Sequence, residues 1–134
     1  MFQHASAALV VGVLLSLAVP AAAQDAAGRF LLLATSRTGT MEDELNDAGA
    51  AGYRFAATQG GETAFGGREA VVVMQRDPTG GRYRYILLAT SSTQTMQDEL
   101  NATPPEFQLV GFTVFESLFG GKEAAAILEA PAED

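Results

Sequence analysis

The chain has 134 residues and a net charge of −8, from sixteen acidic and eight basic side chains. This acidity argues against nucleic acid as a partner, because phosphates require a basic surface. There is no cysteine and only one histidine, His4, so disulfides, thiol nucleophiles and cysteine metal sites are excluded.

The N-terminal segment has the pattern of a secretory signal peptide. An apolar run at residues 7–19 is followed by a proline and by three alanines that end at Ala23, as in a cleavable leader with small residues before the cut. A retained anchor over residues 5–23 is the alternative, but two serines and the proline dilute it. We therefore expect a signal peptide at residues 1–23 and cleavage after Ala23.

The exported chain, residues 24–134, would then be periplasmic or secreted, with no stable membrane anchor after cleavage. His4 would leave with the signal peptide, and the usual general base and most zinc or copper ligands would leave with it. We accordingly expect no metal, no cofactor and no catalytic residue.

The exported part contains one sequence twice. Residues 30–46 and 85–101 are identical at twelve of seventeen positions, and FGGREA at 65–70 returns as FGGKEA at 119–124. A repeat of this length is typical of a duplicated supersecondary unit. We expect a single domain made of repeat 1 at 29–76, a hairpin linker at 77–82 and repeat 2 at 83–129.

Each repeat is expected to begin with a strand and continue into a helix. Residues 30–34 and 85–89 are continuously apolar, which predicts strands covered on both faces. Thr40 and Thr95 are predicted as the helix N-caps. The acidic residues that follow are expected to complement the positive end of the helix dipole rather than to form a calcium site or a carboxylate pair. They are Glu42, Asp43, Glu44 and Asp47 in repeat 1 and Glu99 in repeat 2, while Asp43 and Asp98 are also predicted to form a weak capping box with Thr40 and Thr95.

Two further strands complete each repeat. The pattern predicts strands at 53–58 and 69–76, and again at 107–115 and 123–129. We therefore predict an α+β fold, with two tandem strand-helix-strand-strand repeats forming a mainly antiparallel sheet with two helices and a pseudo-twofold axis. Since two helices cover only one sheet face, we expect the other face to be buried by curling of the sheet or by a second chain in a homodimer.

In repeat 1, a strand is followed by a helix with an ELN core, a glycine-aromatic pair (GYRF at 52–55) and a glycine-rich turn before an apolar strand. This order of motifs resembles the small bacterial domain of unknown function 4177 family. Repeat 2 departs from this pattern, with Glu106 and Phe107 in place of Gly52 and Tyr53. The resemblance implies a compact strand-helix-strand-strand fold and supplies no catalytic residue.

Two loop motifs are candidate ligand sites. Hydroxyl side chains at the helix starts could hold a small polar ligand, and paired glycines beside a basic residue could bind an anion. The structural alternatives, capping and turn formation, are favoured for both. The candidate residues are Ser36, Thr38, Thr40, Ser91, Thr93, Thr95, Gly66, Gly67, Arg68, Gly120, Gly121 and Lys122.

Two classes of function remain open. The absence of histidine and cysteine from the exported chain, together with the repeated loops, favours a non-catalytic binding or interaction module for a partner protein or a small polar ligand. The alternative is a carboxylate-dependent hydrolase of a cell-envelope polysaccharide, with Glu62 and Glu116 facing each other across a cleft.

Overall fold

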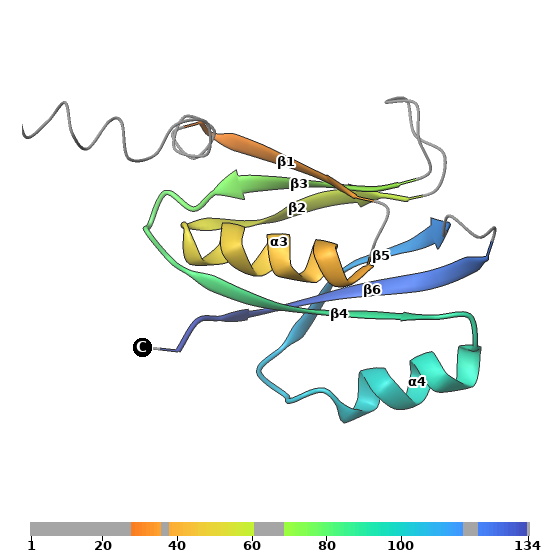
Figure 1. Ribbon diagram of the computed structural model, residues 1–134. Coiled ribbons are helices and arrows are strands. Elements are labelled where there is room, and N and C mark those ends of the chain that lie inside the picture. The colour runs from red at the N-terminus through yellow and green to blue at the C-terminus, as the bar shows by residue number, and fades with distance from the viewer. Residues whose placement is uncertain (1–27, 36–37, 61–68, 117–120, 134) are drawn as a thin grey trace, which may run out of the picture.

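The computed structural model describes residues 28–35, 38–60, 69–116 and 121–133, with only the backbone at 115–116. The predicted strand-helix-strand-strand order appears twice, which confirms the α+β class (Figure 1). The elements are β1 (Phe30–Thr35), α3 (Thr38–Ala50), β2 (Tyr53–Gln59), β3 (Ala70–Arg76), β4 (Tyr83–Thr90), α4 (Thr93–Ala102), β5 (Gln108–Glu116) and β6 (Lys122–Pro131). The predicted signal peptide lies outside the described residues.

The strands form two three-stranded antiparallel sheets, ordered β1-β3-β2 and β4-β6-β5. The two repeats pair in the same register: Leu31 lies opposite Met74 in the first sheet, and Ile86 lies opposite Leu128 in the second. The strand pairing also shifts register at equivalent points of the two sheets, after Phe55 in β2 and after Leu109 in β5. The repeats are therefore equivalent residue by residue.

The linker between the repeats forms a turn but not the predicted hairpin. Asp77 accepts a hydrogen bond from the backbone of Thr79 at 2.9 Å, and Gly80 adopts φ +80°. However, β3 already has β1 and β2 on its two edges, so it has no free edge for β4. The chain therefore crosses from the first sheet to the second at this turn.

The main core lies where the first sheet, α3 and the second sheet meet. It combines residues on the helix side of the first sheet, such as Leu33 and Met74, with Met41 and Leu45 of α3. Ile127 of β6 belongs to the same cluster, although it comes from repeat 2. In Figure 1, α3 lies between the two sheets, alongside β4.

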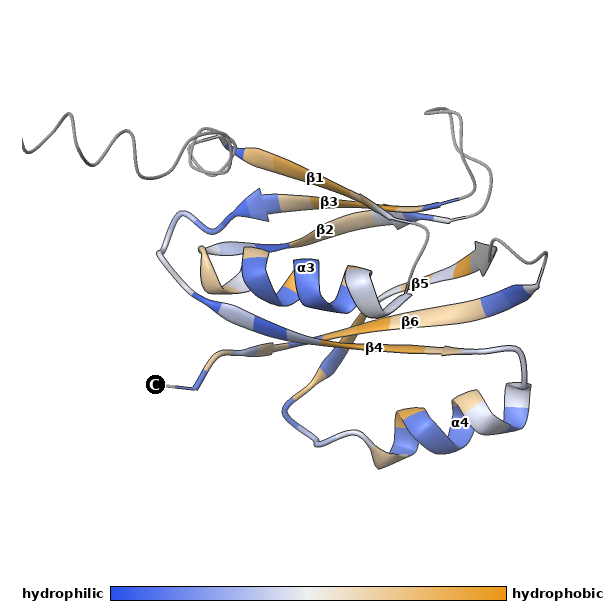
Figure 2. Cartoon of the chain, in the orientation of Figure 1, coloured by the Kyte–Doolittle hydropathy of each residue, from blue (hydrophilic) through white to orange (hydrophobic). Residues whose placement is uncertain are grey.

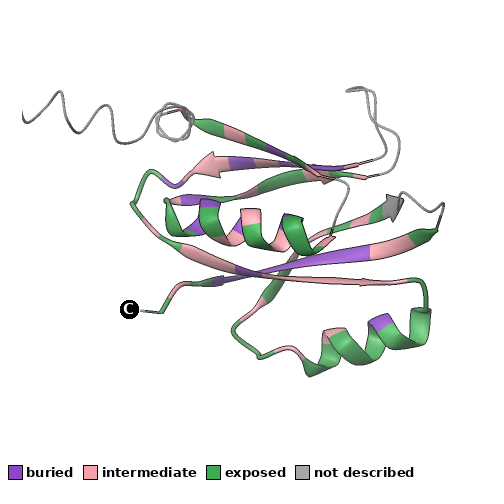
Figure 3. Cartoon of the chain, in the orientation of Figure 1, coloured by how far each residue is buried: buried purple, intermediate pink, exposed green. Residues whose placement is uncertain are grey.

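A smaller core lies on the other side of the second sheet, under α4. Met96 of α4 packs there with Ala126 and Leu128. Because residues on both sides of β6 are buried, this strand is covered on both faces, as Figure 3 shows along much of its length. The expectation that the apolar strands are covered on both faces thus holds for β6.

Within a single chain this expectation does not hold for β1, and cover by a second chain stays a prediction. The β1 residues Leu31 and Leu33 point toward the core, but Phe30 and Leu32 are 53% and 50% exposed. They lie on the outer face of the first sheet, by which we mean the face opposite its own helix. β1 is apolar (Figure 2), and on this face the Arg29 guanidinium lies over the Phe30 ring, 4.9 Å from its centroid, while half of the Phe30 and Leu32 surface remains exposed.

The two repeats meet through different surfaces. Repeat 1 contributes α3 and the helix side of its sheet, whereas repeat 2 contributes the outer face of its sheet through Tyr85 and Ile127. A twofold axis, as the duplication led us to expect, would bring equivalent surfaces together. The repeats are instead arranged head to tail.

The helix starts also differ from the prediction. The N-cap of α4 is Ser92, whose hydroxyl accepts a hydrogen bond from the Thr95 amide at 3.1 Å, so Thr95 lies inside the helix. Thr40 likewise lies inside α3, which starts at Thr38. Neither helix has an acidic residue in its first turn, so the dipole does not explain the acidic cluster.

Candidate functional site

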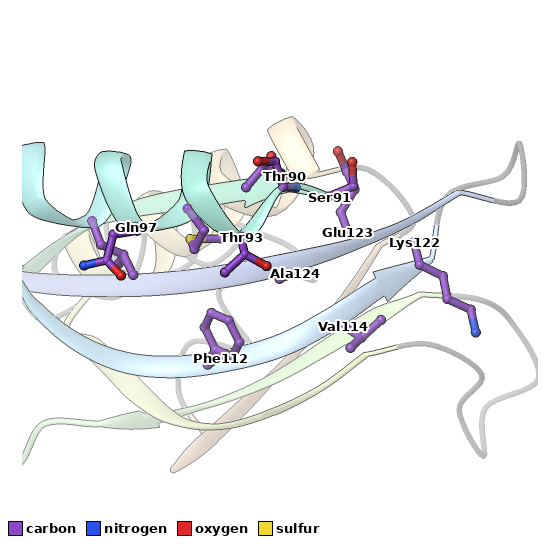
Figure 4. A pocket seen from close by; sticks show the side chains of 12 residues that line it. Thr90, Ser91, Thr93, Gln97, Phe112, Val114, Lys122, Glu123 and Ala124 are labelled. Carbon is purple, nitrogen blue, oxygen red and sulfur yellow. Dashed lines mark hydrogen bonds between the residues drawn. The ribbon is translucent and has the colours of Figure 1, made fainter.

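A groove of about 400 Å³ runs between α4 and β5 (Figure 4). Met96, Leu100 and Ala124 contribute the apolar part of its lining, and Phe112 and Val114 flank it from β5. Among the described residues, the lining is Thr90, Ser91, Ser92, Thr93, Met96, Gln97, Leu100, Phe112, Val114, Lys122, Glu123 and Ala124.

The groove brings together three of the residues predicted for ligand binding. Ser91, Thr93 and Lys122 lie on its polar rim, whereas Thr95 is not part of the lining. In repeat 1, Thr38 lines a separate polar hollow of about 290 Å³ with Glu42 and Glu99.

Two further candidates that the structure describes are not part of these two linings. Thr40 is exposed on α3, and Gly121 is exposed before β6. The other five lie outside the described residues: Ser36, Gly66, Gly67, Arg68 and Gly120.

Large apolar side chains are exposed along β5, beside the groove. Leu109, Phe112 and Val114 are each at least half exposed. These three residues pair across the strands with Leu128, Ala126 and Ala124 of β6. Since Ala126 and Leu128 pack against α4, all three side chains lie on the face of the second sheet that carries α4. With Phe30 and Leu32, they are the exposed large hydrophobic residues of the described chain.

The equivalent space in repeat 1 is filled. There, the second sheet packs into the angle between α3 and β2, so that Tyr85 and Ile127 join the main core. Gly111 of β5 lies so close to β2 that a side chain at this position would meet the Phe55 ring at 2.7 Å. The groove at α4 is therefore the position that a further repeat would occupy.

Two side chains of α3 bind the exposed edge of β4. Asn46 donates to the Tyr85 carbonyl at 3.1 Å and accepts from the Tyr85 amide at 2.8 Å, while Glu42 accepts from the Leu87 amide at 2.8 Å. Sequence reasoning missed this role. The signal was Asn46 and its equivalent Asn101, since asparagine is a weak helix former and is nevertheless kept in both helices.

A buried carboxylate completes the contact between the repeats. Glu129 is 7% exposed and pairs with Arg54 at 2.9 Å. It also accepts hydrogen bonds from the Tyr85 hydroxyl at 2.7 Å and from the Phe55 amide at 3.2 Å. Burial and the bond to Glu129 raise the pKa of Tyr85, so the tyrosine is a neutral donor here and a structural rather than a reactive group.

The acidic side chains bear on the alternative of a carboxylate-dependent hydrolase. In the part of the chain that the structure describes, no three acidic side chains converge to hold a metal ion. The carboxylate with the most strongly lowered pKa, Asp77, is engaged by Tyr83 and Thr79 in the linker turn. The side chains of the predicted carboxylate pair, Glu62 and Glu116, lie outside the described residues.

Searches of family models, curated proteins and solved structures found no match to this chain. The resemblance to the domain of unknown function 4177 family therefore stays a prediction from short motifs. Within the described ranges, no helix has the length and apolar composition needed to cross a membrane.

Proposed function

We propose that this chain is an exported, non-catalytic interaction module that binds a protein partner through the groove between α4 and β5. The carrying observation is that the equivalent space in repeat 1 is filled by a folded protein surface, the second sheet. The groove in repeat 2 has the same kind of apolar lining and stays open.

The exposed residues beside the groove support a protein rather than a small polar ligand. Leu109, Phe112 and Val114 extend the apolar surface along β5 beyond the hydroxyl rim. A small ligand at Ser91 and Thr93 would leave this strip in water. Contiguous exposed apolar surface on a soluble protein typically marks an interaction site.

The test is photo-crosslinking in the producing cell. A photoreactive amino acid replaces Phe112, and the matched control carries it at Ala102, which is exposed at the end of α4. We expect a discrete protein adduct from position 112 only, and its loss when Val114→Asp is added. No adduct at position 112, or the same adduct from both positions, would contradict the proposal.

A further inference from the structure

We infer that the partner in the groove is a second copy of this chain, which presents the outer face of its first sheet. This inference rests on the proposed interaction function and names its partner. The contact would repeat, between molecules, the head-to-tail contact that joins the two repeats within one chain.

The first observation is that the chain carries both halves of this contact. In the strand register, Phe30 and Leu32 correspond to Tyr85 and Leu87, which pack against repeat 1. On the other side, Leu109 corresponds to Phe55, which packs in the main core. Phe112 corresponds to Thr58, whose methyl group lies beside Gly111 of the second sheet. Val114 lies on the same side of β5, so the exposed large hydrophobic residues of the described chain lie on these two surfaces.

The second observation is the strand edge. β4 is an edge strand whose outward amides are bound by Glu42 and Asn46 of α3. β1 is the equivalent edge strand of the first sheet, and among the described residues only β3 pairs with it. An open strand edge with apolar residues is a template for association.

The side chains that would bind this edge are present on α4. Gln97 and Asn101 occupy the positions of Glu42 and Asn46, and both are exposed. An asparagine amide can again bond both backbone groups of one residue, here Phe30 of the second copy, and the glutamine oxygen can accept from the amide of Leu32.

The third observation is a matched change of charge. Within the chain, Glu129 pairs with Arg54 across the contact between the repeats. In the proposed contact between copies, Gln75 takes the position of Glu129 and Gln108 takes the position of Arg54, so both charged side chains are replaced by neutral amides. Glu42 likewise becomes Gln97. A contact that is exposed in the free chain and buried in the assembly avoids the cost of desolvating charges in this way.

One groove and one outer face per chain make the contact heterologous. Such contacts close into rings or continue as fibres, depending on the rotation between copies. They also predict complementation: a variant with a damaged face keeps its groove, and a variant with a damaged groove keeps its face.

Sedimentation velocity over a concentration series tests this inference. We expect the chain, purified from the compartment where it accumulates, to self-associate, and Leu32→Asp and Phe112→Asp each to be monomeric. An equimolar mixture of the two variants should form a one-to-one complex. Both positions are at least half exposed, so circular dichroism should show native folds. Phe30→Asp and Val114→Asp serve as a second pair.

The control is Ala102→Asp, which adds the same charge at an exposed position where repeat 1 already has Asp47. It should associate like the unaltered chain. A mixture of the two damaged variants that stays monomeric overturns the inference. If the chain is monomeric but position 112 crosslinks to a different protein, the self-contact is overturned and the interaction function stands. If it is monomeric and position 112 gives no adduct, both fail.

Discussion

Asn46 links the two repeats, because its side-chain amide bonds both the amide and the carbonyl of Tyr85. We expect Asn46→Ala to lower the free energy of unfolding by roughly 1–3 kcal/mol, since it leaves two partly buried backbone groups without their partner. Urea denaturation measures this change. Asn101→Ala should leave the unfolding of the monomer almost unchanged and weaken self-association instead. Equal losses of stability in both variants would contradict the proposed difference between the two asparagines.

Asp77 makes the linker turn sensitive to acid. Hydrogen bonds from the Tyr83 and Thr79 side chains and from the Thr79 amide lower its pKa from 3.8 to about 2. A carboxylate with a lowered folded-state pKa contributes stability above its unfolded pKa, and this contribution is lost as the pH falls from about 4 to about 2.

We therefore expect Asp77→Asn to reduce the loss of stability over this range of pH, as measured by urea denaturation at pH 6, 4 and 2.5. Tyr83→Phe, which removes the largest cause of the shift, should have the same effect in weaker form. An unchanged pH dependence in Asp77→Asn would show that the turn does not contribute to acid sensitivity.

At the scale of the elements, the start of α4 offers a direct choice between two capping residues. Ser92→Ala removes the hydroxyl that accepts from the Thr95 amide and should cost about 1 kcal/mol. For a domain of this size the melting temperature should fall by roughly 4 °C. Thr95→Ala should be neutral or slightly stabilising, because alanine is the better helix former. If Thr95→Ala lowers the melting temperature more than Ser92→Ala does, Thr95 is the N-cap of α4.

The order and type of the elements could be predicted because apolar periodicity is a local signal. The continuous run at Val71 to Met74 marks β3, and Pro104 stops α4 close to where the structure ends it, at Ala102. The cap was missed because SSTQT offers several hydroxyl residues in a row, and only the backbone geometry selects Ser92. The same run of hydroxyl residues is the basis for predicting a small-ligand site at the rim of the groove, and that site stays a prediction.

The arrangement of the whole molecule could not be read from the repeat. Duplication indicates that two units exist, but it does not show which of their surfaces meet. A strand with apolar residues on both faces can pack against the other repeat through either face. The roles of Glu42 and Asn46 depend on β4, about forty residues away along the chain. The groove is open because no element of the described residues covers it as the second sheet covers the equivalent space in repeat 1.

Charge should govern self-association at this scale. The contact proposed between copies uses mainly amides and apolar side chains, with Lys122 and Glu123 as the charged residues of the groove lining, while each chain carries a net charge of −8. Copies therefore repel one another at long range, and added salt screens this repulsion. We expect association, measured by sedimentation velocity, to strengthen between low salt and about 0.15 M. Weakening with salt would indicate that ion pairs hold the copies together.

The most direct test of the head-to-tail arrangement is hydrogen exchange at single amides over a range of protein concentrations. The amide of Leu87, which Glu42 binds within the chain, should be protected at every concentration. The amide of its equivalent Leu32 should exchange rapidly in dilute solution and become protected as the chains associate. The arrangement is contradicted if the Leu32 amide stays unprotected in the associated state, or if the Leu87 amide exchanges as fast as that of Leu32 in dilute solution.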